Sequence, residues 1–180
     1  KLDADIAVLE LDEAHGVHFV KATAPRYSLI LNVMRDQLDR FGEIDSTAKL
    51  LHTIANHTKE AVILNREDTR VAAIANDLPK STTATYFGIN PELRKTFPND
   101  DELHSAPVKS KPPKALATLD SFTNTKAIFK VNGESFVTTT KLKGVYNLFN
   151  AAAALSLVKT ILPDSKTAKL IKTLGTITPA

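Results

Sequence analysis

The chain has 180 residues, of which 43% are hydrophobic and 24% are charged, and its formal net charge is +3. These values predict one globular domain with a hydrophobic core and exclude a disordered or fibrous protein. The absence of cysteine excludes disulfides, thiolate zinc sites and cysteine nucleophiles. No apolar run is long enough for a membrane span and no signal peptide is recognised, so we expect a cytoplasmic protein.

The two halves of the chain differ in charge. Residues 1–90 carry 10 Lys and Arg against 13 Asp and Glu, whereas residues 91–180 carry 13 against 7. A basic half could face nucleic acid, an anionic membrane surface or a phosphorylated small molecule. Because its lysines are scattered and are not interleaved with arginine and aromatic residues, we expect no nucleic-acid partner.

The first half alternates strands and helices. Apolar runs predict buried strands at residues 5–11, 27–33, 61–65 and 83–89. A short helical or irregular segment separates the first two of these strands. Helical spacing predicts helices over residues 44–58 and 66–78. Asp45 or Ser46 could cap the first of these helices. Strands joined by helices at this rhythm indicate an α/β fold with a parallel sheet.

A proline-rich stretch interrupts this rhythm. Residues 90–114 contain five of the nine prolines and little periodicity, which predicts a flexible insertion. Alternating residues over about 115–140 then predict antiparallel strands, and the dipeptide Asn132-Gly133 is a strong signal for a β-hairpin turn.

Two helices are expected at the end of the chain, within residues 145–175. The first covers residues 145–162 and begins after Gly144. The second covers residues 164–174, with Asp164 as its N-cap and Gly175 as its stop.

Acidic residues follow the first two predicted strands. Glu10, Asp12 and Glu13 come at the end of the first strand, and Asp36 and Asp39 follow the second. Parallel strands end at the same edge of a sheet, where open α/β sheets bind ligands, and carboxylates there could coordinate Mg²⁺. Solvated polar turns are the alternative interpretation.

Two asparagines stand near the start of the predicted helix 145–162. Asn147 and Asn150 are three residues apart and therefore share one helix face. Each carboxamide has a donor and an acceptor, which is what recognition of an adenine edge requires. Asparagines in this position are also common helix caps, so both interpretations stay open.

Four ordered motifs over residues 5–154 resemble the central, ATP-binding domain of the Mur ligase family. They are VLELDEA (8–14), LNVMRDQLDRFGEID (31–45), ILNREDTRVA (63–72) and GVYNLFNAAAA (144–154). The chain is most similar to the MurT branch, the ligase-like subunit of lipid II isoglutaminyl synthase. Gln37 and Tyr146 occupy places where amino-acid-adding members of the family have histidine.

The resemblance implies a P-loop-type α/β domain that is only partly present. The expected fold is a mainly parallel sheet flanked by helices, with a small antiparallel hairpin. The family's glycine-rich phosphate loop would precede residues 5–11, so its first strand and loop are expected to be missing. The family's carboxyl-terminal domain would begin near the end of the chain. Residues 1–180 are therefore predicted to form a partial central domain, inactive by itself.

The resemblance also implies ATP and Mg²⁺ as cofactors, and no zinc, because the cysteine ribbon of many MurT-type proteins is absent. The expected metal ligands are Glu10, Asp36 and Gln37. The expected nucleotide contacts are Tyr146, Asn147 and Asn150. No catalytic residue is assigned.

The implied function is that of an ATP-dependent carbon–nitrogen ligase of peptidoglycan synthesis. It would amidate the D-glutamate α-carboxyl of lipid II through an acyl phosphate, at the inner face of the membrane. Its partners would be lipid II or its muropeptide and a glutaminase subunit (GatD-like). The alternatives are an amino-acid-adding Mur ligase and a non-catalytic nucleotide-binding or interaction domain.

Overall fold

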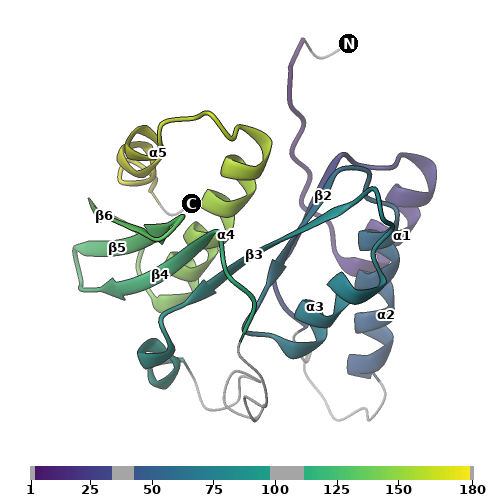
Figure 1. Cartoon of the computed structure of the whole chain (residues 1–180), viewed down its shortest axis with the longest axis horizontal. Coiled ribbons are helices and arrows are strands. Elements are labelled where there is room, and N and C mark those ends of the chain that lie inside the picture. Colours follow the sequence, from purple (N-terminus) through teal and green to yellow (C-terminus); the bar gives the residue numbers. More distant parts are fainter. Residues whose placement is uncertain (1–2, 34–42, 98–111, 179–180) are drawn as a thin grey trace.

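A computed structural model describes residues 3–33, 43–97 and 112–178 of the chain (Figure 1). Its helices are α1 (Glu13–Ala22), α2 (Glu43–Asn56), α3 (Thr69–Ala73), α4 (Val145–Ile161) and α5 (Thr167–Leu174), with 3-10 helices η1 (Ile74–Asp77) and η2 (Pro91–Thr96). Its strands are β1 (Tyr27–Ile30), β2 (Ala61–Asn65), β3 (Thr83–Ile89), β4 (Ala117–Phe122), β5 (Lys126–Val131) and β6 (Glu134–Thr139). None of the helices in these ranges is long and apolar enough to cross a membrane.

The six strands form one mixed sheet in the order β1-β2-β3-β4-β5-β6. The first four strands are parallel neighbours, and β5 and β6 continue the sheet in antiparallel fashion. Parallel neighbours need a crossover connection, and α2 supplies it between β1 and β2. The predicted α/β fold with an antiparallel hairpin is therefore confirmed.

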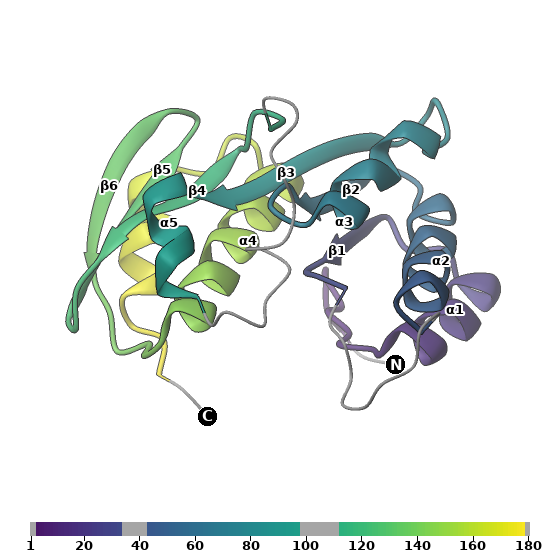
Figure 2. The same cartoon turned by 90° about the horizontal axis from the view of Figure 1, so that it is seen from below.

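Both faces of the parallel sheet are covered, as the β2 sequence requires. Every residue of β2 is buried, and its side chains alternate between two apolar clusters. Ile63 contributes to the cluster that contains α4, whereas Val62 and Leu64 contribute to the cluster that contains residues of α2 and α3. Figures 1 and 2 show α4 and α5 together beside β3 to β6, and α1 beside α2.

The predicted hairpin turn is confirmed by its backbone. Asn132 and Gly133, which join β5 to β6, both have positive φ angles, of 52° and 89°. A two-residue turn with two positive φ angles matches the right-handed twist of the flanking strands, and Asn-Gly tolerates it best. Gly144, at the N-cap of α4, also has a positive φ, of 82°.

Two predicted helix caps are wrong. The helix α2 begins at Glu43, so Asp45 and Ser46 lie inside its first turn and not before it. The helix α5 begins at Thr167 with Lys166 at its N-cap. Asp164 instead lies in a turn that the Ser165 amide closes by donating to the Leu162 carbonyl, at 3.0 Å. Gly175 ends α5, as predicted.

The predicted strand at residues 5–11 is also wrong. This segment has no regular secondary structure and no strand partner within the described sheet. Its apolar side chains are exposed, with Val8 at 81% and Leu9 at 58%. A strand needs a neighbouring ladder to satisfy its amides, and the apolar pattern of the sequence does not by itself supply one. The segment that follows it is a regular helix, α1.

Candidate functional site

The carboxyl ends of β1, β2 and β3 meet at one edge of the sheet, because these strands are parallel and adjacent. The third motif leaves β2 at this edge. Its polar residues form what we call the strand-end cluster, together with an arginine of η2. The cluster consists of Asn65, Arg66, Glu67, Asp68 and Arg94.

Asp68 joins the end of β1 to the start of α3. Its side chain caps α3 by accepting hydrogen bonds from the amides of Arg70, at 2.9 Å, and Val71, at 3.1 Å. The second carboxylate oxygen accepts from the amide of Val33, at 2.8 Å. Val33 is the third residue of the second motif, so a buried carboxylate of the third motif fixes the chain at the start of the second.

Glu67 is the most enclosed charge of the cluster, with a side chain only 2% exposed. Its Oε1 accepts from the Arg66 Nε at 2.8 Å and from the Ile89 amide at 3.1 Å. Its Oε2 accepts from the Arg94 guanidinium at 2.6 Å. Two guanidinium groups and one amide compensate for the burial of this carboxylate, which ties β2, β3 and η2 together.

Arg66 extends the same linkage to the chain that enters β4. Its Nη2 donates to the Ile89 carbonyl at 2.8 Å, and its Nη1 reaches the Pro113 carbonyl at 3.4 Å. The side chain lies directly over Gly88. A Cβ atom at Gly88 would be 2.9 Å from the Arg66 Cδ and 2.7 Å from the Glu67 Oε1, so a larger residue at this position of β3 would displace both side chains.

The strand-end cluster is a scaffold more than a set of reacting groups. The carboxylate oxygens of Glu67 and Asp68 accept from groups of the chain itself, and Asn65 Oδ1 accepts from the Glu67 amide at 2.9 Å. Sequence reasoning matched this segment to a family motif but assigned it no role. The signal that could have found it was the run of six polar residues from Asn65 to Arg70, which directly follows the apolar residues 61–64 of β2.

The first turn of α4 lies at the same end of the sheet as η2. The Tyr146 ring contacts Phe97, which follows η2, in an edge-to-face arrangement with centroids 5.2 Å apart. Phe97 in turn contacts Phe149 at 5.8 Å. Tyr146 is half-buried at the margin of the larger apolar cluster, so its ring is part of the packing of the core.

The two asparagines of α4 are both exposed on one side of its first turns. Asn147 Nδ2 donates to the Lys143 carbonyl at 2.8 Å, which is a local contact across one turn. Asn150 makes no such contact with the described chain and is open to solvent. The contact of Asn147 stabilises the start of the helix, whereas the Asn150 side chain is exposed and is free of such a contact with the described chain.

The predicted magnesium ligands are not assembled in the described residues. Glu10 lies in the exposed segment before α1, so its predicted place at the end of a strand is wrong, whereas its role as a metal ligand stays a prediction. Asp36 and Gln37 lie outside the described residues. Within residues 3–33, 43–97 and 112–178, no three His, Cys, Asp or Glu side chains form a group that could hold a metal ion. One exposed carboxylate is not a metal site, and we derive no metal-dependent step from it.

Asp12, another acidic candidate, caps a helix. Its Oδ1 accepts from the His15 amide at 2.8 Å, and its Oδ2 lies 2.6 Å from the His15 Nδ1. The backbone hydrogen bond from His15, followed by its side chain, lowers the pKa of the Asp12 carboxyl below its ordinary value of 3.8.

A parallel sheet with crossover helices and a buried polar motif at its carboxyl edge defines an α/β domain of the ligand-binding type. The sequence matches the Mur ligase middle domain over residues 1–158, and the chain belongs to this family.

Relatives and a solved structure agree with this assignment. The chain is 28% identical to the MurT subunit of lipid II isoglutaminyl synthase of Streptococcus pneumoniae (strain ATCC BAA-255 / R6), over 94% of its own length and 43% of that protein. It is 27% identical to the UDP-N-acetylmuramate–L-alanine ligase of Thermobifida fusca (strain YX), over 91% of its length and 31% of that protein. The fold matches MurF ligase from Thermotoga maritima in complex with ADP, with a TM-score of 0.62, 17% identity and coverage of 91% and 33%. The chain thus spans less than half of these proteins.

Proposed function

We propose that the chain is the central part of an ATP-dependent, amide-forming ligase of peptidoglycan synthesis. The observation that carries this proposal is the family match over residues 1–158, supported by the parallel sheet at whose carboxyl edge the third motif lies. ATP recognition is assigned to the first turns of α4, with Asn150 and Asn147 facing the adenine and Tyr146 beside them. Glu10, Asp36 and Gln37 are proposed as the ligands of Mg²⁺.

The finer reaction is the amidation of the D-glutamate α-carboxyl of lipid II. A carboxylate oxygen attacks the γ-phosphorus of ATP and releases ADP; ammonia then attacks the acyl phosphate and releases inorganic phosphate. Magnesium would supply charge stabilisation of the transferred phosphoryl group. The ammonia would come from a glutaminase (GatD-like) partner. Support comes from the 28% identity to a MurT subunit and from Gln37 and Tyr146 in place of histidines.

An amino-acid-adding ligase is the second candidate, because the identity to UDP-N-acetylmuramate–L-alanine ligase is almost as high, at 27%. The two reactions share an acyl-phosphate intermediate, but they differ in the nucleophile that attacks it and in the molecule that carries the activated carboxylate, which is lipid II for the first relative and UDP-N-acetylmuramate for the second. A non-catalytic nucleotide-binding domain is the third candidate. The lipid II ligase would act on the cytoplasmic side of the membrane, where its lipid-linked substrate would present the stem peptide.

The decisive experiment supplies the full-length protein with ATP, Mg²⁺ and either lipid II or UDP-N-acetylmuramate, and compares ammonia with a mixture of amino acids as nucleophile on each substrate. We expect ADP release and an amidated stem peptide with ammonia alone, identified by mass spectrometry. Incorporation of an amino acid would establish the second candidate. ATP binding without any product from either nucleophile, with the glutaminase present, would establish the third.

A further inference from the structure

Helix α5 presents three exposed lysines. Lys166, Lys169 and Lys172 recur every third residue and are exposed, whereas Ile171 and Leu174 of the same helix are buried against the core. The lysines therefore lie on the outward side of α5. None of the three forms an ion pair with another residue in the described part of the chain.

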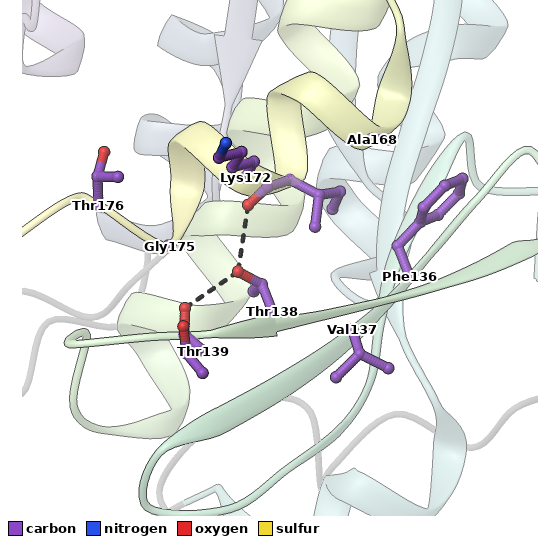
Figure 3. A pocket seen from close by; sticks show the side chains of 9 residues that line it. Phe136, Val137, Thr138, Thr139, Ala168, Lys172, Gly175 and Thr176 are labelled. Atoms are coloured by element: carbon purple, nitrogen blue, oxygen red, sulfur yellow. Dashed lines mark hydrogen bonds between the residues drawn. The ribbon is translucent and has the colours of Figure 1, made fainter.

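The helix that carries these lysines is held firmly on the sheet. The Thr138 hydroxyl of β6 donates to the Ile171 carbonyl at 3.2 Å. Gly175 approaches β6 so closely that a Cβ there would be 2.7 Å from the Thr139 carbonyl oxygen. An open groove of about 440 Å³ runs between α5 and β6, with Lys172 on its helix side (Figure 3). The backbone that carries the lysines is therefore fixed against the sheet.

The carboxyl-terminal part of the described chain has an excess of positive charge. Residues 112–178 contain nine lysines, no arginine and three acidic residues. One of these acids, Asp120, is neutralised by Lys130 at 2.6 Å. Asp164, in the turn before α5, is the acidic residue nearest to the lysines in the sequence. A lysine surface without arginine or exposed aromatic rings is suited to anionic lipid headgroups more than to nucleic acid.

Exposed aliphatic side chains stand at both ends of α5. Leu162 precedes the helix and is 49% exposed, and Ile177 follows it and is 46% exposed. These two side chains lie on the segments that lead into and out of α5. Exposed apolar groups combined with lysines are typical of segments that lie at a lipid–water interface, where the apolar groups enter the headgroup region and the lysines contact lipid phosphates.

We propose that Lys166, Lys169 and Lys172, with Leu162 and Ile177, form a surface that binds the anionic face of a lipid bilayer. The proposal rests on the proposed function for its purpose, because a ligase that acts on a lipid-linked peptide gains from being held at the membrane where that peptide lies. The binding itself requires no nucleotide and no catalysis, so it is tested separately.

The test is co-sedimentation of the full chain with vesicles of phosphatidylglycerol and phosphatidylethanolamine, compared with vesicles of phosphatidylcholine alone. We expect binding to the anionic vesicles only, weakened by added salt. The triple variant K166E/K169E/K172E should lose about tenfold or more of the partition coefficient. The control variant K49E/K59E/K80E, with the same change in net charge at three exposed lysines of the other half, should bind as the parent does.

Four outcomes would overturn the proposal: no binding to anionic vesicles, equal binding to phosphatidylcholine, equal losses in both triple variants, or equal competition by a random-sequence DNA. The first would exclude a membrane surface, and the last would indicate a general polyanion surface. Circular dichroism of each variant checks that the fold is intact. Ligase activity on a short-chain, water-soluble lipid II should be the same in K166E/K169E/K172E as in the parent. If neither the parent nor the variants have this activity, the proposed function is contradicted, but the inference of membrane binding is not.

Discussion

Glu67 is a charge that the chain buries immediately after its most apolar strand. Its two oxygens accept from two arginines and one backbone amide, so every part of the carboxylate has a partner. A buried ion pair contributes little net stability compared with an apolar replacement, but removal of one partner leaves the others uncompensated. The contribution of Glu67 to the free energy of unfolding is therefore best measured in a variant that lacks its charge.

Replacing Glu67 with glutamine should lower the free energy of unfolding by about 2 kcal/mol, because Arg66 and Arg94 lose their counter-ion in a site that is only partly open to water. Urea denaturation followed by circular dichroism measures the change. Glu92→Gln, at an exposed carboxylate of η2, is the matched control and should change it by less than about 0.5 kcal/mol. Equal effects in the two variants would contradict the structural role assigned to Glu67.

Asp12 provides a pH-dependent helix cap. Its pKa in the folded chain is lowered by the His15 amide and side chain, so the cap stabilises the fold at pH values above the ordinary value of 3.8 and is lost as the pH falls through the lowered pKa. NMR titration of the Asp12 carboxyl carbon should give a pKa below 3.8. In His15→Ala the pKa should rise only partway, because the backbone hydrogen bond remains. An unshifted pKa would show that the cap does not form in solution.

Asn150 is the exposed amide that we assign to adenine. Asn150→Ala should weaken ATP binding to the full-length protein by about tenfold, the loss of one or two hydrogen bonds, without changing stability. Calorimetric titration with ATP measures the affinity. Asn76→Ala, at an exposed asparagine of η1, should bind ATP as the parent does. An unchanged affinity for ATP in Asn150→Ala would exclude this face of α4 as the adenine site.

At the scale of elements, the chain is connected by side chains that reach from one element to the next. Asp68 caps α3 and also holds the amide of Val33 beyond β1, although 35 residues separate the two in sequence. One carboxylate thus fixes both the start of a helix and the exit of a strand. Removal of this carboxylate should therefore destabilise both the start of α3 and the chain that leaves β1.

Asp68→Ala should lower the free energy of unfolding by about 3 kcal/mol, the sum of a lost N-cap and a buried amide left without an acceptor. Asp68→Asn should cost less, since its amide oxygen can still accept. Chemical denaturation measures the free energies of unfolding. Hydrogen exchange at the amides of Val33 and Val71 shows which of the two elements is destabilised. If exchange rises at Val71 but not at Val33, the link to β1 is not significant in solution.

Periodicity and turn chemistry predicted most of the elements, because they are local properties of the sequence. The β3 bounds, residues 83–89, and the Asn132-Gly133 turn were confirmed without change. The strand predicted at residues 5–11 is wrong because an apolar run becomes a strand only where a neighbouring strand is available, and this condition is not local in the sequence. Glu67 and its arginines were missed for the same reason: the partners come from different elements, and only the fold brings them together.

At the scale of the whole molecule, the segment before α1 leaves apolar side chains in water. Val8 is 81% exposed, and Ile6, at 54%, has the same character. Val8→Asp should therefore change the free energy of unfolding of the chain by less than about 0.5 kcal/mol, as expected for a surface substitution. Val62→Asp, at a fully buried position of β2, should prevent stable folding. Thermal denaturation distinguishes the two, and a large effect of Val8→Asp would indicate that this segment is covered in solution.

The order of the strands has a consequence for how the protein assembles on the ribosome. Each strand from β2 onward pairs with the strand immediately before it in the sequence. No strand has to be held open for a partner that is made much later, so the sheet can grow one strand at a time as the chain emerges. Successive pairings also keep loop closures short, which favours rapid folding. Among the six described strands, β1 and β2 should therefore pair first during synthesis, and the β5–β6 hairpin should join the sheet after them.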